Sequence, residues 1–172
     1  LWRTLPSTVL DARLFCQHLE KLNGYHFNIL DDVYTLFKKL PAALEAFRET
    51  RKTSKMINAG IIGGSDMDFF KVYTRAAIAF VEDNWEVMAN TNNPSLFNII
   101  FEQYLFTCMA SQRGIPIAQS VTHPVSATFL ELTHFHRVPQ TVHYAHLIGG
   151  HKKNALFLEQ IILRLRLEFP RY

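Results

Sequence analysis

The chain has 172 residues, of which 48% are hydrophobic and 19% are charged, and its formal net charge is +3. This apolar content excludes an intrinsically disordered chain, and the length fits one domain or a large portion of a bigger one. The small, scattered positive charge gives no support for nucleic-acid binding. No apolar run reaches the ~18 residues of a transmembrane helix, so no membrane span is expected.

Both cysteines, Cys16 and Cys108, lie within apolar patterns. Such positions are typical of buried free thiols, and nothing in this usage requires an oxidising compartment. We therefore expect a cytoplasmic protein. The chain opens at Leu1, without Met and within an apolar pattern, so we expect a fragment of a longer protein.

Apolar residues recur at helical spacing along most of the chain. The predicted helices cover residues 7–22, 27–39, 41–50, 66–89, 94–112 and 153–169. Asn23-Gly24 is expected to end the first helix, and Ser65 to cap the fourth.

Strands are predicted at residues 56–64, where glycines punctuate an apolar run, and at 115–121 and 142–148. Residues 125–136 fit either a short helix or a loop. Because helices outnumber and separate the strands, the sequence predicts a helix-rich α/β fold.

The glycine-containing run around Asn58-Ala59-Gly60 is the first candidate site. Glycines after a strand let a ligand or a second backbone approach closely, and the following helix N-terminus could attract a phosphate. A tight strand-to-helix turn is the alternative. Asp66 and Asp68 either bind Mg²⁺ or Mn²⁺ or serve as helix-capping residues.

Histidines concentrate late in the chain, where a zinc site could form. Six of the eight are His123, His134, His136, His143, His146 and His151. No cysteine or carboxylate nearby completes a recognised ligand pattern. A histidine-based metal-binding module therefore stays an alternative.

Two further candidate sites lie on predicted helices or next to them. After His146, a Gly-Gly turn and two lysines open the last helix, which suits a metal and a diphosphate. A turn with solvated lysines is the alternative. Glu102 and Gln103 interrupt an apolar helix face. If buried, Glu102 needs partners; otherwise the two residues form an exposed pair.

These motifs, in this order, resemble the C-terminal half of GT-A-fold glycosyltransferases, the family that includes glycogenin and bacterial lipopolysaccharide galactosyltransferases. Residues 56–62 resemble the family's F-N-[AS]-G strand. Residues 101–105 resemble its D-Q-D helix, with Glu102 in place of the first Asp. Residues 146–152 match its late H-x-x-G-x-x-K element, although Lys153-Asn154 follows where the family has Pro-Trp. A set of bacterial glycosyltransferase-like proteins pairs N-A-G-I-x-G-G with H-L-I-G-G and is more similar still.

The resemblance implies an incomplete GT-A-like sandwich of a few strands flanked by helices, and transfer of a hexose from a nucleotide sugar to a glycan acceptor. It implies that His146 is a ligand of Mn²⁺ or Mg²⁺ and that Gly149 and Lys152 contact the diphosphate. Asn58, Ala59 and Gly60 would bind the substrate. Glu102 and Gln103 would be catalytic-site residues that bind sugar hydroxyls.

One motif of the family, which normally precedes the N-A-G strand, is missing from this sequence. The metal-binding D-x-D motif normally lies there, whereas residues 1–55 contain none, and Asp31-Asp32 falls within a helical pattern. The resemblance therefore implies an enzyme only if the protein is complete. A non-catalytic binding domain of the same ancestry is the alternative.

Overall fold

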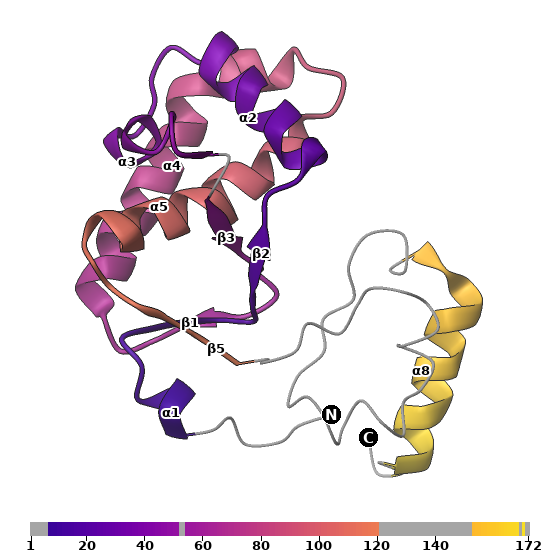
Figure 1. Ribbon diagram of the computed structural model, residues 1–172. Coiled ribbons are helices and arrows are strands. Elements are labelled where there is room, and N and C mark those ends of the chain that lie inside the picture. Colours follow the sequence, from indigo (N-terminus) through magenta and orange to yellow (C-terminus); the bar gives the residue numbers. More distant parts are fainter. Residues whose placement is uncertain (1–6, 52–53, 121–152, 169, 171–172) are drawn as a thin grey trace. The chain divides into compact units, whose positions relative to one another are not determined.

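A computed structural model describes residues 7–51, 54–120, 153–168 and 170 (Figure 1). The chain divides into two compact units, one formed by residues 5–120 and the other by residues 1–4 with 121–172. In the second unit, the described element is the helix α8 (Ala155–Glu168), which confirms the predicted last helix.

The first unit mixes helices and short strands, so the predicted helix-rich α/β character is confirmed at that level. Its elements are α1 (Ser7–Leu10), β1 (Leu14–Cys16), β2 (Leu19–Lys21), α2 (Gly24–Leu36), α3 (Ala42–Ala46), β3 (Lys55–Ile57), β4 (Ile62–Gly63), α4 (Met67–Ala89), the 3₁₀-helix η2 (Pro94–Phe97), the π-helix η3 (Ile99–Tyr104), α5 (Leu105–Gln112) and β5 (Ile117–Gln119). Within the described ranges, no helix is long and apolar enough to cross a membrane.

The strands form two small sheets. In the first, the order is β4-β1-β5, with β1 antiparallel to β4 and parallel to β5. In the second, β2 and β3 pair in antiparallel fashion, with Leu19 opposite Ile57. Because β1 leads into β2 and β3 leads into β4, the same two stretches of chain run beside each other through both sheets.

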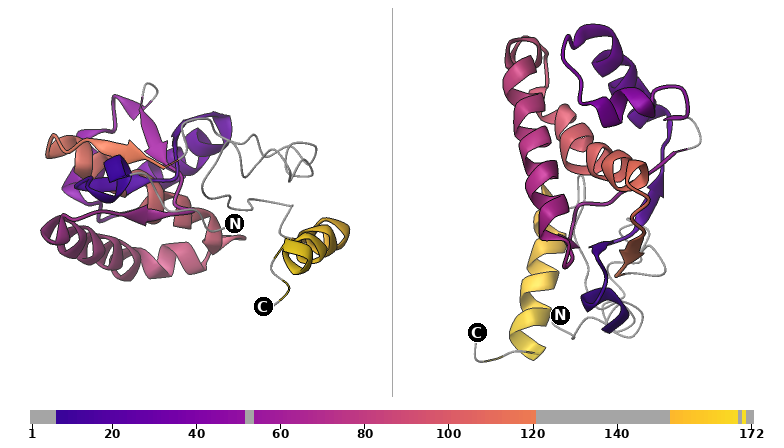
Figure 2. Two further views of the ribbon diagram at one scale, coloured as in Figure 1. Left: turned by 90° about the horizontal axis from the view of Figure 1, so that it is seen from below. Right: turned by 90° about the vertical axis from the view of Figure 1, so that its left-hand side faces the viewer.

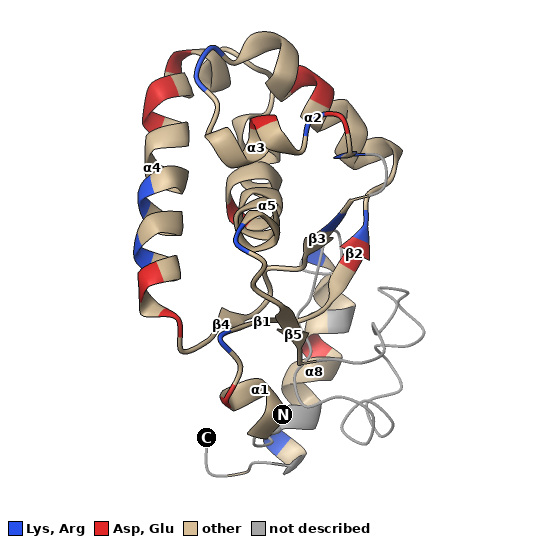
Figure 3. Ribbon diagram, turned by 60° about the vertical axis from the view of Figure 1, so that its left-hand side comes forward, with Lys and Arg blue, Asp and Glu red and all other residues tan. Residues whose placement is uncertain are grey.

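The hydrophobic core lies between the long helix α4 on one side and the β2–β3 pair on the other, with α5 between them (Figure 2). Phe69 from α4 and Phe106 from α5 are fully buried and meet edge to face, with ring centroids 5.0 Å apart. On the strand side, Met56 and Ile57 of β3 are buried. The charged residues of α4, coloured in Figure 3, are all exposed.

Both cysteines are buried and free, as predicted. Cys16 lies in the central strand β1 and Cys108 in α5. Burial raises the pKa of each thiol to about 12. Both sulfurs are therefore protonated at neutral pH and behave as small core side chains.

The predicted helix over residues 7–22 is wrong. The chain is helical only to Leu10 and then forms β1 and β2. All three residues of β1 are buried, and β1 is the central strand of its sheet. Burial on both faces of a strand favours a continuous apolar run, and here that tertiary pairing overrides local helical spacing.

Asn23 begins a helix instead of ending one. Its side-chain oxygen accepts a hydrogen bond from Tyr25 N–H at 3.0 Å, and His26 Nδ1 accepts one from Asn23 N–H at 3.1 Å. These reciprocal bonds form a capping box. Helix α2 therefore starts at Gly24, three residues before its predicted start, and ends at Leu36.

The predicted strand region 56–64 and helix 66–89 are confirmed by β3, β4 and α4. The N-cap, however, is Asp66 and not Ser65. Asp66 accepts a hydrogen bond from Phe69 N–H at 2.9 Å and pairs with Arg13 at 2.6 Å. In the described structure Asp66 therefore serves as a helix cap, the second of the two roles predicted for it.

The predicted continuous helix 94–112 is divided into η2, η3 and α5. The π-helical part carries Glu102 and Gln103. The predicted helix 41–50 is shorter, since α3 covers only Ala42–Ala46. Strand β5 confirms the strand predicted at 115–121. The predictions for residues 125–136 and 142–148 lie outside the described residues.

Candidate functional site

The predicted substrate-binding segment Asn58-Ala59-Gly60 lies in a bulge. Cys16 is opposite Ile62 in one sheet, and Leu19 is opposite Ile57 in the other. Between these two pairs, one stretch of chain has two residues, 17 and 18, and the opposite stretch has four, 58–61. Gln17 N–H donates to Ile61 O at 3.0 Å, and Asn58 N–H donates to His18 O at 2.8 Å. Bulges of this kind re-aim side chains and are common beside functional sites.

Asn58 fixes the shape of this bulge. Its side chain is 6% exposed, so its polar atoms need partners within the protein. The side-chain oxygen accepts a hydrogen bond from Gly60 N–H at 2.9 Å, which forms an Asx-turn, and the side-chain nitrogen donates to Glu20 Oε1 at 2.5 Å. Asn58 therefore orients both the loop that follows it and a carboxylate on the neighbouring strand.

Glu20 is the charged group of the site. Its Oε1 lies 3.4 Å from His18 Nε2 as well as accepting from Asn58, and its side chain is 27% exposed. The hydrogen bond from His18 is the main reason that the pKa of Glu20 is lowered; the bond from Asn58 and the positive potential of His18 and His26 add to this, while burial opposes it. The carboxylate is thus ionised at neutral pH.

We call Gln17, His18, Glu20 and Asn58 the Glu20 cluster. Three of them were not predicted as site residues, because residues 7–22 were expected to be helical. In a helix, residue 18 lies on a different face from residues 17 and 20, so His18 and Glu20 would not meet. No pattern within the sequence signals the sheet pairing that brings them to Asn58, since their partners lie about forty residues away.

Acid should destabilise the protein in two steps. Burial lowers the pKa of His26 below its usual 6.5, so the unfolded chain takes up a proton more readily and stability falls as the pH drops through 6.5. The pKa of Glu20 is also lowered, so stability present above its usual 4.5 is lost as the pH falls through the lower, folded-state value. Urea unfolding midpoints measured from pH 7 to pH 3 test this.

His26→Gln is the matched variant for the first step, because glutamine at this position preserves the capping box but does not titrate. We expect its unfolding midpoint to vary less between pH 7 and pH 5 than that of the wild type, with the lower step unchanged. An identical pH dependence in the two proteins would contradict the assignment to His26.

The π-helix η3 is held by a tyrosine of α4. The Tyr73 hydroxyl lies 3.1 Å from both Phe101 O and Glu102 O and donates to these carbonyls. A π-turn leaves carbonyl groups outside the usual helical ladder, so an external donor stabilises it. Burial and the Glu102 carboxylate raise the pKa of Tyr73 to about 12, so its hydroxyl keeps the proton that it donates.

Thr107 connects the π-helix to the bulge. Its hydroxyl donates to Gln103 O at 3.0 Å and accepts from Ile57 N–H at 3.0 Å. Ile57 directly precedes Asn58. The Thr107 hydroxyl therefore links the backbone of Gln103 to the residue that precedes the bulge. Gln103 is half-buried, whereas Glu102 is exposed and lies close enough to Tyr73 to raise its pKa.

The remaining predicted residues divide into two groups. Ala59 and Gly60 lie in the bulge and are half-buried. His146, Gly149 and Lys152, together with the late histidine cluster, lie outside the described residues. Within the described part of the chain, no three His, Cys, Asp or Glu side chains gather closely enough to hold a metal ion.

Comparison with known proteins places the chain in a family. Residues 1–172 match the model of a family of unknown function, DUF6734, and the chain belongs to that family. No curated protein and no solved structure matches it.

Proposed function

We propose that this chain is a nucleotide-sugar-dependent glycosyltransferase-like protein, which in its complete form transfers a hexose to a glycan acceptor. One observation carries the proposal. The N-A-G segment, on which the resemblance to glycosyltransferases rests, forms a bulge in which buried Asn58 holds the ionised carboxylate of Glu20. Carboxylate and carboxamide groups are suited to bind the hydroxyls of a sugar.

The topology gives further support. Strands β1 and β5 are parallel, and both end beside the Glu20 cluster. In α/β proteins, ligands bind outside the carboxyl ends of parallel strands. The π-helix that carries Glu102 and Gln103 is joined to the same bulge through Thr107, and π-helical turns are frequent at functional sites.

In the proposed reaction, the residues act by binding and by stabilising charge. Asn58, Ala59 and Gly60 position the sugar, and Gln103 and Glu102 bind hydroxyls at the edge of the site. Gly149 and Lys152 contact the diphosphate, and the Lys152 ammonium offsets the negative charge that develops on the leaving group. The proposed Mn²⁺ or Mg²⁺ is assigned through His146 and would supply Lewis-acid stabilisation of the diphosphate.

The test is a calorimetric titration of the 172-residue chain with UDP, GDP and CMP, each with and without Mn²⁺. We expect one nucleotide to bind in a metal-dependent manner. His146→Ala should weaken that binding at least tenfold, while the matched variant His151→Ala, in the same histidine-rich stretch, should leave it unchanged.

Equal affinity in the two variants would overturn the role of His146. If no nucleotide binds with Mn²⁺ even when all flanking sequence is present, the alternative of a non-catalytic binding domain replaces the proposed function. Stoichiometric zinc in the purified protein would favour the histidine-based metal module instead.

A further inference from the structure

We propose that Glu20, with Gln17 and His18 from the turn between β1 and β2, forms a recognition subsite for the hydroxyl groups of a carbohydrate ligand at the carboxyl ends of β1 and β5. The inference rests on the proposed function, because that function supplies a sugar as the ligand. It assigns recognition to three side chains that the resemblance to glycosyltransferases does not include.

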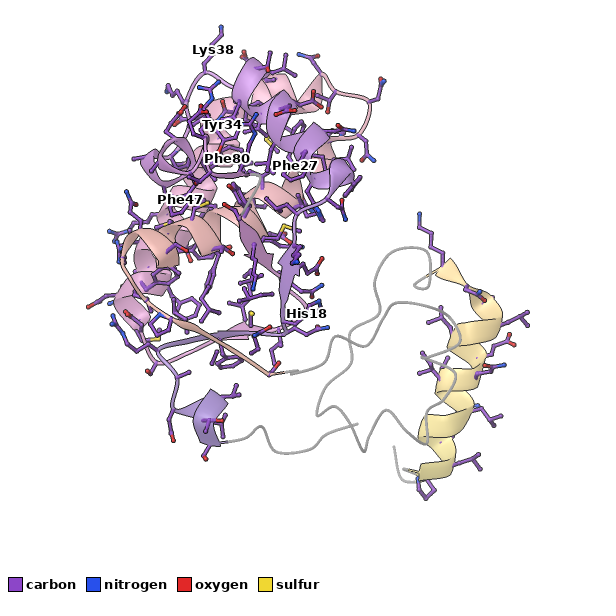
Figure 4. All side chains as sticks on the ribbon, viewed as in Figure 1. His18, Phe27, Tyr34, Lys38, Phe47 and Phe80 are labelled. Carbon is purple, nitrogen blue, oxygen red and sulfur yellow. The ribbon has the colours of Figure 1, made fainter. Side chains whose placement is uncertain are left out.

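The subsite lies where two parallel strands end. Gln17 and His18 directly follow β1, and Ser120 directly follows β5. Ser120 N–H donates to Cys16 O at 2.8 Å, and the Gln119 side chain accepts from Leu19 N–H at 2.9 Å. These bonds fix the two strand ends against each other. Figure 4 shows His18 beside the end of β5, at the start of β2.

Glu20 is positioned to accept hydrogen bonds from a ligand. Among the described residues, both of its partners, His18 and Asn58, approach the same oxygen, Oε1. Two donors on one oxygen hold the carboxylate in a fixed orientation, which leaves Oε2 as an acceptor on a side chain that is 27% exposed. A fixed, partly exposed carboxylate loses little conformational entropy when a ligand binds.

Two buried polar atoms in the turn that precedes β2 lack a partner within the described structure. They are Oε1 of Gln17, whose residue is 8% exposed, and Nδ1 of His18. Oε1 of Gln17 is an acceptor, and Nδ1 of His18 accepts a hydrogen bond when the imidazole carries one proton and donates one when it carries two. Buried polar groups are normally paired, and an unpaired one costs free energy. A ligand that donates hydrogen bonds would therefore pair with the acceptors of the Glu20 cluster.

A hydroxylated ligand fits this set better than a cation or an anion. An anion would be repelled by the Glu20 carboxylate. A metal ion needs several ligating side chains, and no group of three His, Cys, Asp or Glu side chains that could hold one is found among the described residues. Neutral hydroxyls donate hydrogen bonds without adding charge, and adjacent sugar hydroxyls present several donors together.

The chemistry of Glu20 favours recognition over proton transfer. Its pKa is lowered by the hydrogen bonds that it accepts, so it is a weak base at neutral pH. It accepts a hydrogen bond from a hydroxyl but does not remove the proton. The subsite therefore affects how tightly a sugar binds, and a variant of Glu20 should change affinity.

The experiment is a two-dimensional ¹H–¹⁵N NMR titration of the 172-residue chain with galactose, glucose and N-acetylglucosamine, each to high millimolar concentration. We expect one of these sugars to shift the amide signals of residues 17–20 and 58–60. Glu20→Gln keeps the shape and the acceptor for Asn58 but removes the charge. Because hydrogen bonds to charged groups are the stronger ones, we expect it to raise the Kd about tenfold or more.

Glu86→Gln is the matched control, since Glu86 is exposed on α4, away from the cluster. Unchanged amide spectra outside the site would show that Glu20→Gln is folded, and Gln17→Met, of similar volume, gives a second variant expected to weaken binding. The proposal is overturned if no sugar shifts residues 17–20, or if Glu20→Gln and Glu86→Gln bind equally. Sugar binding here without any binding of nucleotide and Mn²⁺ would defeat the proposed function alone.

Discussion

Replacing Gly64 with alanine is expected to lower the free energy of unfolding by about 3–5 kcal/mol. Gly64 has φ +146°, a conformation that residues with a side chain rarely adopt. An added Cβ would also overlap the backbone carbonyl of Arg13. This carbonyl cannot move away, because it accepts from Asp66 N–H at 3.1 Å and leads directly into β1. Urea unfolding followed by circular dichroism measures the loss.

Gly24→Ala is the control for this change. Gly24 is the first residue of α2, and nothing lies within 4 Å of the position where its Cβ would be. The substitution should be neutral or stabilising by about 0.5 kcal/mol, because alanine restricts the unfolded chain. A Gly64→Ala protein as stable as Gly24→Ala would show that the turn between β4 and α4 can adopt another conformation.

Removing the ring of Phe106 should cost about 3–5 kcal/mol. Phe106 is fully buried and touches three aromatic rings of α4: the centroid distances are 5.0 Å to Phe69, 5.1 Å to Tyr73 and 6.1 Å to Phe70. Alanine would leave a cavity between α4 and α5, which a close-packed core cannot fill. Near-ultraviolet circular dichroism with urea unfolding of Phe106→Ala would measure both the packing and the stability.

Trp85→Ala removes a larger ring from α4, but Trp85 is 58% exposed. Its loss should cost less than about 1 kcal/mol. Phe106→Leu, which refills part of the cavity, should lie between the two. If Phe106→Ala and Trp85→Ala are equally stable, the aromatic contact between α4 and α5 does not support the fold.

The sequence was most informative where one element carries a complete local pattern. Helix α4 has apolar residues at helical spacing, so its start and end were predicted to within one residue, although its cap is Asp66 and not the predicted Ser65. Around Asn23, the same Asn-Gly pair fits a helix end or a helix start. The capping box with His26 decides between them, and that contact is evident only in three dimensions.

The candidate site was predictable only in its glycine-containing half. Asn58-Ala59-Gly60 follows an apolar run and precedes a capped helix, so a special turn could be inferred there. Glu20 and His18 reach this turn through sheet pairing, which depends on neighbours distant along the chain. The π-helical form of residues 99–104 likewise depends on Tyr73, which lies on another helix.

The pairing of β1 with β5 has a consequence for how the protein folds. Leu19 of β2 and Gln119 of β5, joined by a hydrogen bond next to this pairing, are 100 residues apart in the chain. The entropy of closing so long a loop must be lost before the contact stabilises anything, and chains with such distant pairings fold slowly. Helices α2 and α4 consist of local contacts and can form earlier. During synthesis, the segment that contains the Glu20 cluster must therefore wait for β5 to leave the ribosome before its strand ends are joined.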